Sequence, residues 1–336
     1  MTWLSNETVD RLRDVATRPS LPGDRYVILR PLGRGGMGAV YAARDTELAR
    51  DVAIKVSNAA TPTSGLEERL KQEAHVLARL EHPGIVPVHD AGVLEDGRVF
   101  YVMKLVHGET LEQHARTLAT EAARLGVFER IAETVAFAHA AGVVHRDLTP
   151  SNVMAGRFGE VLVLDWGVAK LVGAAASAVP RRVPGPASAG HTDAGTRIGT
   201  PGFMAPEQAS GAAAEAGPPA DVFALGALLF WLLTGDTPPP DAPAVVSRLR
   251  SISPPPSRRL RAIVAKCLSP EPGARYADAG ALVDDLARYR QGAPVAAHRE
   301  TWLEAAALWL GRYRTFILLI VAYLVMRAVL ALWGRP

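Results

Sequence analysis

Residues 143–152 constrain the fold of this chain more tightly than any other segment. Two valines lead into His145-Arg146-Asp147, and Asn152 follows five residues after the aspartate. The run His-Arg-Asp-Leu with an asparagine five residues after the aspartate is a specific pattern, and its polar residues are typical of a loop. In such a loop a carboxylate can accept the proton of an attacking hydroxyl group, and an amide oxygen at this spacing can bind a metal ion. The alternative is that Asp147 only stabilises a turn.

A second carboxylate follows an uninterrupted apolar run. Residues 161–164 are Val-Leu-Val-Leu, which predicts a buried strand, and Asp165-Trp166-Gly167 comes directly after it. Gly167 permits a sharp exit from the strand. The pattern therefore predicts that the carboxylate of Asp165 is delivered to a place where Mg²⁺ can bridge phosphate groups.

A glycine-rich motif near the N-terminus has the pattern G-x-G-x-x-G-x-V. Its glycines are Gly33, Gly35, Gly36 and Gly38, and its valine is Val40. In a dinucleotide-binding fold such glycines open a helix, but residues 40–44 continue as a strand, so the motif predicts a hairpin over phosphate groups. Backbone N–H groups approach phosphate oxygens closely where no Cβ intervenes. A plain tight turn would need fewer glycines.

A lysine and a glutamate farther along are predicted to form an ion pair. Lys55 lies in the otherwise apolar run 52–56, where an ammonium group without an anion would be costly. The four leucines of residues 66–80 recur at helical spacing, and Glu73 falls on the same helix face. The pair would hold the ammonium group towards the phosphates of a nucleotide. A snorkelling surface lysine and a glutamate at the edge of the helix face are the alternatives.

Composition excludes several classes of protein. The chain has 336 residues, 49% of them apolar, unlike disordered or collagen-like sequences. Lys and Arg number 37 against 34 Asp and Glu, so the net charge of +3 is too small and too dispersed for nucleic-acid binding through phosphate contacts. The single cysteine, Cys267, cannot form an intramolecular disulfide, and no Cys/His cluster has the spacing of zinc ligands.

Taken in order, these motifs resemble those of a protein kinase catalytic domain, of the bacterial membrane-anchored Ser/Thr type, over residues 26–290. Residues 199–207 resemble the segment that binds peptide in Ser/Thr kinases. The resemblance implies an α+β, bilobal fold. A small β-rich N-lobe that contains one key helix is expected at residues 26–106, and a larger helical C-lobe at residues 107–290.

The resemblance also implies a role for each motif residue. Asp147 is expected to be the catalytic base, Asn152 and Asp165 to bind Mg²⁺, and Lys55 to pair with Glu73. Met103 corresponds to the gatekeeper position beside the nucleotide. The contacts implied for ATP are Leu32, Gly33, Gly35, Gly36, Gly38, Val40, Ala53, Lys55, Met103, Leu105 and Met154.

Structural roles are implied for three other residues. Glu207 is expected to pair with Arg275, and Asp221 to brace the catalytic loop. Asp221 also begins residues 221–234, which are apolar almost all round and stop at Gly235. At this length the run predicts a buried helix at the centre of the C-lobe.

The sequence departs from the kinase pattern at two positions. Thr149 stands where Ser/Thr kinases usually carry a lysine that contacts the γ-phosphate. Losing that cation would cost about 3 kcal/mol of transition-state stabilisation if nothing replaces it. Trp166 stands in place of the usual phenylalanine, and its larger aromatic ring still suits an apolar site.

Residues 172–196 are mostly Ala, Gly, Ser, Pro and Arg, and are expected to form a flexible activation-loop insert. Thr192 and Thr196 are the candidate phosphosites, because a phosphate there would be able to pair with Arg146. Autophosphorylation of this loop by a second copy of the chain implies a transient homodimer.

Both ends of the chain are expected to lie outside the catalytic domain. Residues 1–25 form a polar N-terminal extension without the pattern of a secretory signal. Residues 315–333 carry one charge, Arg327, and are expected to form a transmembrane helix that follows an amphipathic juxtamembrane segment at residues 291–314. More arginines precede the span than follow it, which predicts a cytoplasmic catalytic domain anchored to the inner (cell) membrane. An apolar tail helix docked on the domain is the alternative.

We therefore expect a Ser/Thr protein kinase that transfers the γ-phosphoryl group of ATP to protein hydroxyl groups with Mg²⁺, or with Mn²⁺ in its place. Its partners are expected to be protein substrates and no nucleic acid. The alternative, motivated by Thr149, is a pseudokinase scaffold that binds nucleotide or partners with little phosphotransfer. A small-molecule phosphotransferase shares the Asp–Asn spacing, but residues 199–207, with Phe203 and no tryptophan, favour a protein substrate.

Overall fold

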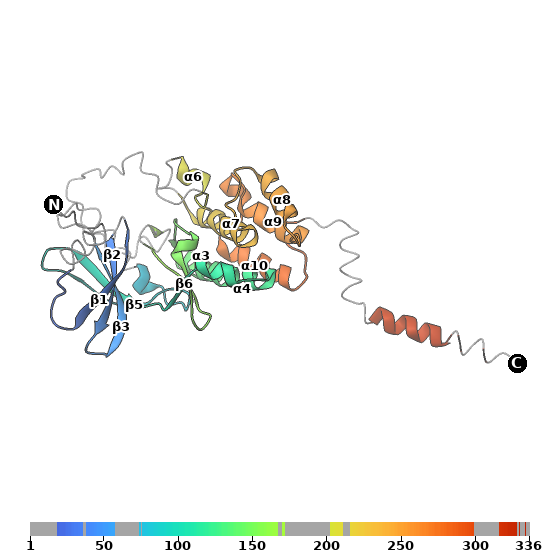
Figure 1. Cartoon of the computed structure of the whole chain (residues 1–336). Helices are drawn as coiled ribbons and strands as arrows, with labels where there is room; N and C mark the ends of the chain where they lie inside the picture. The colour runs from blue at the N-terminus through green and yellow to red at the C-terminus, as the bar shows by residue number, and fades with distance from the viewer. Residues whose placement is uncertain are drawn as a thin grey trace, which may run out of the picture.

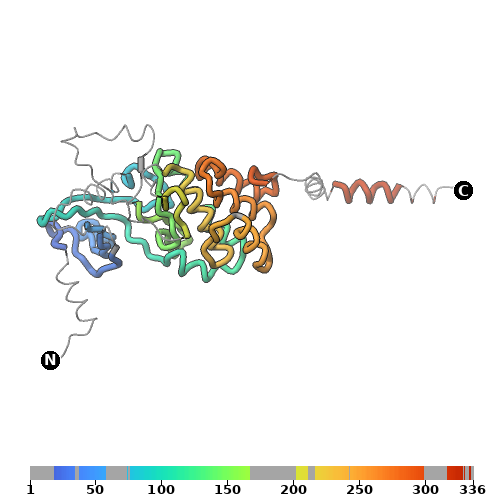
Figure 2. Tube along the Cα trace, turned by 90° about the horizontal axis from the view of Figure 1, so that it is seen from above, coloured from blue at the N-terminus to red at the C-terminus, as the bar shows by residue number. Residues whose placement is uncertain are grey.

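The structure divides into two lobes that differ in secondary structure. The computed structural model describes residues 19–35, 38–57, 74, 76–166, 170–171, 202–210, 216–298, 316–327, 329 and 333. The first lobe along the chain is built on an antiparallel sheet, and the second mostly from helices (Figure 1). A view from above shows the two lobes side by side (Figure 2). The predicted bilobal α+β fold is confirmed.

The small lobe contains a five-stranded antiparallel sheet in the order β1-β2-β3-β5-β4. Its strands are β1 (Tyr26–Gly35), β2 (Gly38–Asp45), β3 (Arg50–Ser57), β4 (Val88–Val93) and β5 (Val99–Lys104). On the central strand β3, Val52, Ile54 and Val56 pack into the apolar cluster of this lobe. Because side chains alternate along a strand, Ala53 and Lys55 point to the opposite face.

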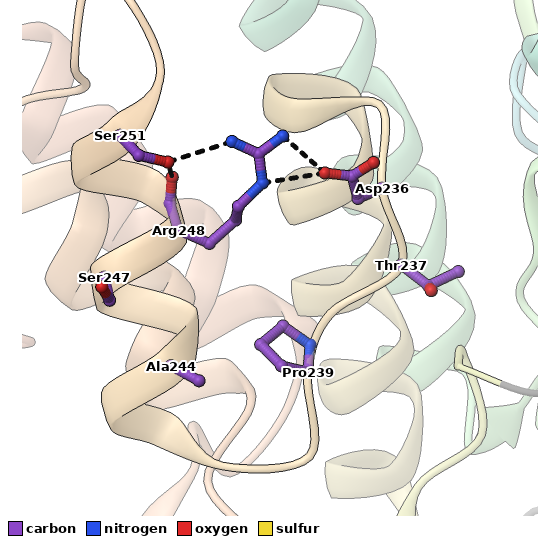
Figure 3. Close-up of a pocket in the computed structure, with 7 residues that line it drawn as sticks. All are labelled: Asp236, Thr237, Pro239, Ala244, Ser247, Arg248 and Ser251. Carbon is purple, nitrogen blue, oxygen red and sulfur yellow. Dashed lines mark hydrogen bonds and ion pairs between the residues drawn. The ribbon is translucent and has the colours of Figure 1, made fainter.

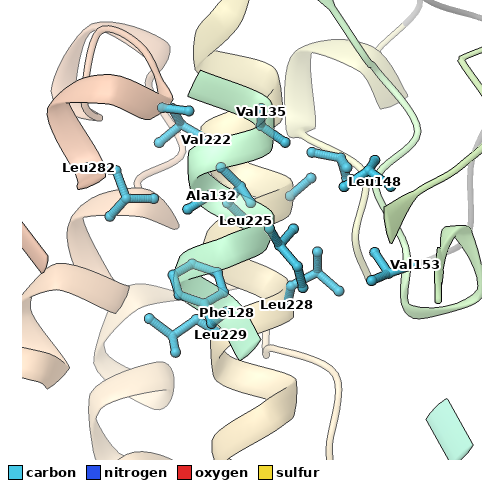
Figure 4. Close-up of a cluster of buried hydrophobic side chains, with 14 of the residues drawn as sticks. Phe128, Ala132, Val135, Leu148, Val153, Val222, Leu225, Leu228, Leu229 and Leu282 are labelled. Carbon is cyan, nitrogen blue, oxygen red and sulfur yellow. The ribbon is translucent and has the colours of Figure 1, made fainter. Parts of the chain in front are cut away.

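The large lobe is organised around two long helices that pack against each other. The helices of the lobe are α3 (Leu111–His114), α4 (Glu121–Ala140), α6 (Pro206–Ala209), α7 (Pro218–Thr234), α8 (Ala242–Ser251), α9 (Arg258–Cys267) and α10 (Ala279–Arg290). Phe128 and Ala132 of α4 meet Leu225, Leu228 and Leu229 of α7 in the core (Figure 4). α7 ends where Gly235 takes a φ of +80°, which a residue with a Cβ rarely adopts. The predicted central helix of the C-lobe is thereby confirmed.

Short strands position the polar loops of the large lobe. β6 (Gly108–Thr110), β8 (Val153–Gly156) and β9 (Val161–Val163) form one small sheet, and β7 (Val143–Val144) pairs with β10 (Lys170–Leu171). Single turns of 3₁₀ helix span Ala115–Thr117, Pro150–Asn152 and Pro272–Ala274. All of β9 is buried, as the apolar run predicts, and the Val163 N–H group donates to Gly84 O at 2.8 Å. The end of β9 is therefore fixed beside residues 84 and 85, which precede β4.

The predicted helix at residues 66–80 is described only near its end. Residues 74 and 76–79 are helical, and Leu77 and Leu80 are buried, in agreement with the predicted apolar face. The first two leucines of that face and Glu73 lie outside the described residues.

The C-terminal region has two described parts. Residues 291–298 pack on the large lobe, and Val295 is buried in its core. Residues 316–327 form a helix with exposed apolar side chains, such as Phe316 at 67% and Leu319 at 63% exposure. Among the residues that the structure describes, no helix has both the length and the apolar character that crossing a membrane requires.

Candidate active site

Lys55 and Asp165 connect the two lobes through an ion pair. Lys55 Nζ lies 2.9 Å from Asp165 Oδ1. The lysine side chain is only 9% exposed, whereas the aspartate side chain is 46% exposed and open to a ligand. The ammonium group also lies 5.9 Å from the ring centre of Tyr101, which faces Lys55 across β3 and β5. The fold thus joins a residue of the central strand to one that is 110 positions away in sequence.

The residue after Asp165 supports this orientation. Trp166 is buried, and its indole N–H group donates to Val163 O at 3.2 Å. Its ring centre lies 4.6 Å from that of His145. Asp165 itself has a φ of +58°, a conformation that costs a non-glycine residue about 1–2 kcal/mol. The tryptophan is thus accommodated in the interior while Asp165 faces Lys55.

The loop after β7 brings Asp147 and Asn152 together. Asn152 Nδ2 donates to the backbone O of Asp147 at 2.8 Å and to its Oδ2 at 3.2 Å. Because the nitrogen makes these bonds, the amide oxygen of Asn152 is the atom that can bind a cation. Burial raises the pKa of Asp147, and the negative charge of Asp165 raises it further, against the opposing effects of His145 and Asn152. A carboxylate with a raised pKa is a stronger base.

His145 links this loop to the strand that carries Asp165. Its Nε2 lies 2.9 Å from Leu164 O, and its Nδ1 accepts the Asp147 N–H group at 3.2 Å. Because a carbonyl oxygen only accepts hydrogen bonds, Nε2 is the donor in the contact with Leu164 O. The sequence motif predicts no separate role for His145.

Asp221 of α7 braces the same loop through hydrogen bonds. It is fully buried, and it accepts the backbone N–H groups of His145 and Arg146, each at 2.7 Å. It also bonds His139 Nε2 at 2.9 Å. Burial alone would raise the pKa of Asp221, but these hydrogen bonds, led by that of His139, hold it below its ordinary value. Arg146 has a φ of +73°, so the brace maintains a backbone conformation that is otherwise unfavourable.

Thr149 has a neutral partner within the loop. Its side chain is buried, at 2% exposure for the residue, and its Oγ1 lies 2.8 Å from Ser151 Oγ. The hydroxyl pair fills the position where the resemblance leads us to expect a lysine. This position therefore supplies no positive charge.

The glycine-rich motif joins β1 to β2. Two of its glycines differ in the space that an added side chain would have. A Cβ at Gly38 would collide with the carbonyl oxygen of Val56, so close packing of β2 on β3 requires glycine there. At Gly33, by contrast, an added Cβ would meet nothing within 4 Å. Packing within the described residues does not require glycine at this position, which fits close approach of the backbone to a ligand. Gly35 pairs with Gly38 across the hairpin, and Gly36 lies outside the described residues.

The other predicted nucleotide contacts are apolar and come from both lobes. Ala53 of β3 is buried and faces Met103 of β5 across the sheet. The remaining side chains are half-buried or exposed, namely Leu32 (40% exposed), Val40, Met103, Leu105 and Met154. Apolar side chains that stay partly accessible suit the flat ring of a nucleotide base.

The end of the segment predicted to bind peptide is held by a buried arginine. Arg275 Nη1 and Nη2 donate to Glu207 Oε1 and Oε2 at 2.7 and 2.8 Å. Gln208, on the next position of α6, donates through Nε2 to Arg146 O at 2.8 Å. The predicted pairing of Glu207 with Arg275 is present, and Gln208 adds a link to the catalytic loop that the sequence does not predict.

The donor atoms at this site fit Mg²⁺. Asn152 and Asp165 offer an amide oxygen and a carboxylate, the hard oxygen ligands that Mg²⁺ prefers. Within the described ranges, no group of three or more His, Cys, Asp or Glu residues could hold a metal by itself. An ion here would take its remaining ligands from phosphate oxygens and water, which is the usual arrangement for Mg²⁺ bound with a nucleotide.

Several predicted site residues lie outside the described part of the chain. These are Gly36, Glu73, Thr192 and Thr196. The Lys55–Glu73 pair and the phosphosites therefore stay predictions.

A pocket of about 460 Å³ lies elsewhere, between the end of α7 and α8 (Figure 3). Arg248 reaches across from α8 and donates through Nε and Nη2 to Asp236 Oδ2 at 2.8 and 2.6 Å. None of the residues that line this pocket belongs to the predicted nucleotide or catalytic set. One of them, Thr237, packs against Gly202, so the pocket adjoins the segment predicted to bind peptide.

Comparison with known families agrees with this geometry. The family model of the protein kinase domain matches residues 26–285. The chain belongs to the protein kinase family. The match covers both lobes, and it includes Lys55, Asp147, Asn152 and Asp165. The predicted family of this kinase is confirmed.

Similar proteins include bacterial Ser/Thr protein kinases. The kinase is 33% identical over 323 residues to Serine/threonine-protein kinase PknD of Chlamydia caviae, covering 86% of this chain and 34% of the relative. It is 36% identical over 296 residues to PknB of Mycobacterium tuberculosis, covering 83% of this chain and 45% of the relative. This chain thus spans less than half the length of these relatives. The kinase domain of Mycobacterium tuberculosis PknI has the same fold, with a TM-score of 0.58 at 24% identity over 79% of this chain and 96% of that one.

Proposed function

We propose that the chain is a Ser/Thr protein kinase that transfers the γ-phosphoryl group of ATP to hydroxyl groups of proteins. The observation that carries this proposal is the 2.9 Å ion pair of Lys55 and Asp165 beside the Asp147–Asn152 pair. A lysine, a metal-binding carboxylate and a base in one place are the groups that phosphoryl transfer requires. The names of the relatives support a Ser/Thr substrate.

Each residue then has a defined task in the reaction. Asp147 accepts the proton of the incoming hydroxyl group, and Lys55, with Glu73 as its proposed partner, binds the phosphates. Asn152 and Asp165 hold Mg²⁺, which neutralises charge on the triphosphate when bound. The glycine-rich hairpin covers the phosphates with backbone N–H groups.

The proposal is tested with purified chain, [γ-³²P]ATP, Mg²⁺ and myelin basic protein as a generic substrate. We expect label on Ser and Thr of the substrate, and none when EDTA removes Mg²⁺. ATP binding without label transfer, under conditions where a known kinase labels the same substrate, would contradict the proposal and support the pseudokinase alternative.

The absence of a positive charge at Thr149 favours the pseudokinase alternative, and one substitution tests its effect. Thr149→Lys is expected to raise kcat by about tenfold, because it restores a cation near the transferring phosphoryl group. Thr149→Gln is the matched control, since it adds a side chain of similar reach without the charge. Initial rates at saturating ATP measure the effect. Equal rates for the lysine and glutamine variants would show that charge at this position is not what limits turnover.

We propose that a second copy of the chain phosphorylates the activation-loop insert at Thr192 and Thr196. Arg146 supports this, because it directly precedes Asp147 and its guanidinium group, which donates to Ala216 O at 3.2 Å, is only partly buried. A phosphate on the insert would add the charge that an arginine binds.

We also propose that residues 315–333 attach the chain to the cell membrane, with the catalytic domain in the cytoplasm. Exposed apolar side chains all round residues 316–327 are unfavourable in water, and three arginines precede the segment whereas one follows it. We expect the full chain in the membrane fraction of cells even after alkaline carbonate extraction, and a chain without residues 312–336 in the supernatant. Release of the full chain by carbonate would instead indicate a docked tail helix.

A further inference from the structure

A buried carboxylate ties the segment after α10 to the helical lobe. Asp285 of α10 is fully buried, and its Oδ2 accepts the Tyr276 hydroxyl group at 2.7 Å. The backbone N–H groups of Ala296 and Ala297 donate to Oδ1 and Oδ2 at 2.6 and 3.0 Å. Residues 291–298, named here the return segment, therefore complete the hydrogen bonding of a charge that would otherwise be costly to bury.

The return segment has two further attachments to the lobe. Val295 is buried in the large apolar core at 4% exposure. Arg259 of α9 donates through Nη1 to Gly292 O at 3.0 Å. The family match ends at residue 285, so these contacts lie at and beyond the boundary of the shared domain.

Tyr276, which bonds Asp285, directly follows Arg275 in the sequence, so the position of one residue affects that of the other. The Arg275 side chain is fully buried, and its Nε donates to Ser269 O at 2.7 Å. Its Nη1 and Nη2 bind Pro219 O and Pro270 O, each at 2.9 Å, as well as both oxygens of Glu207. Every N–H group of the guanidinium group thus has a hydrogen-bond acceptor. The bidentate bond to Glu207 tolerates little movement of the arginine.

The Tyr276 side chain is held equally firmly. It is 4% exposed, and Lys266 Nζ lies 4.2 Å from its ring centre. Burial raises the pKa of Tyr276, and the nearby charge of Asp285 acts in the same direction, so the phenol keeps the proton that it donates. A connected route therefore runs from the return segment to Glu207. Hydrogen bonds join the segment to Asp285 and Asp285 to Tyr276, the backbone joins Tyr276 to Arg275, and the bidentate pair joins Arg275 to Glu207.

We propose that Tyr276 and Asp285, closed by the return segment, are positioning residues for the protein substrate. They fix the backbone at Arg275, and so hold Glu207 and residues 202–207 in the geometry that binds peptide. They touch neither nucleotide nor the reacting hydroxyl group. The inference rests on the proposed kinase activity, and it makes substrate binding, rather than chemistry, sensitive to the packing of residues 291–298.

The test compares two tyrosines of the full chain that each donate to a carboxylate. Tyr276→Phe is expected to raise KM for myelin basic protein about fivefold, the effect of one lost hydrogen bond, while kcat and KM for ATP change less than about twofold. Tyr289→Phe is the matched control. The hydroxyl group of Tyr289, near the end of α10, bonds Glu121 Oε1 at 3.2 Å, and this bond has no connection to Arg275. This variant is expected to leave all three constants unchanged.

A double variant checks the route. In a Glu207→Gln background, Tyr276→Phe is expected to add little to KM for the protein substrate, since the bond through which it acts is already weakened. Full additivity, an unchanged KM in Tyr276→Phe, or an equal change in Tyr289→Phe would each overturn the inference. Absence of phosphotransfer in the unsubstituted chain would instead contradict the proposed function itself.

Discussion

Asp147→Asn is expected to lower kcat for phosphotransfer by about 10³-fold while ATP still binds. Asparagine has nearly the shape of aspartate, and its amide oxygen can still accept the hydrogen bond from Asn152 Nδ2. An amide, however, cannot take up the proton of the incoming hydroxyl group. The interaction lost is made only in the transition state, so kcat falls and the affinity for ATP is preserved.

Initial rates with [γ-³²P]ATP and myelin basic protein measure the first effect, and titration calorimetry with ATP measures the second. Asp284→Asn is the matched control, because Asp284 is an exposed residue of α10 with no role in the site. It is expected to change neither quantity by more than about twofold. An Asp147→Asn chain that keeps more than about a tenth of the kcat would contradict the assignment of Asp147 as the base.

Lys55 illustrates how much of the site can be predicted from sequence patterns. The period of two along β3 separates Lys55 from Ile54 and Val56, so its position on the face away from the apolar cluster of the small lobe follows from the sequence alone. The apolar run before Asp165 likewise predicts the buried strand β9. That these two residues meet depends on which strands pair and on how the lobes pack, and only the resemblance to a family supplied that information.

The hydrogen bonds of His139 could not be predicted from the sequence. His139 looks like a basic residue in the last turn of a helix, where it would favour the helix dipole. In the structure it bonds Asp221 and accepts the N–H group of Ala279, which is 140 residues away. Local patterns describe neighbours along one element, whereas these partners come together only through tertiary packing.

The backbone conformation at the site could not be predicted from the sequence either. Arg146 and Asp165 adopt positive φ values that a sequence reader assigns to glycine, and no glycine marks either position. Their conformations are imposed by contacts elsewhere, at Arg146 by the carboxylate of Asp221. Strain of this kind is found where the surrounding structure holds a residue in place for function.

This brace is expected to make Asp221→Ala strongly destabilising, with a loss of about 3–5 kcal/mol in the free energy of unfolding. The substitution leaves the N–H groups of His145 and Arg146 and the Nε2–H group of His139 without their acceptor in a fully buried place. Each unsatisfied buried donor costs about 1–3 kcal/mol, and the effects of neighbours are not fully additive. Urea unfolding followed by circular dichroism measures the loss.

Asp236→Ala is the matched control. It removes an exposed aspartate near α7 and so shows whether the loss of stability in Asp221→Ala comes from the buried hydrogen bonds. Asp236 follows the end of α7, and Asp221 lies in the first turn of the same helix, but the Asp236 side chain is 53% exposed and its partner Arg248 is 42% exposed. An exposed ion pair of this kind contributes at most about 1 kcal/mol, so this variant is expected to unfold almost as the unsubstituted chain does. Asp221→Ala is further expected to lower kcat in the fraction that folds, because Arg146 loses the contact that maintains its positive φ and Asp147 follows it directly. If the two variants unfold at the same urea concentration, Asp221 does not brace the catalytic loop, and the shape of that loop must come from His145 and Gln208 instead.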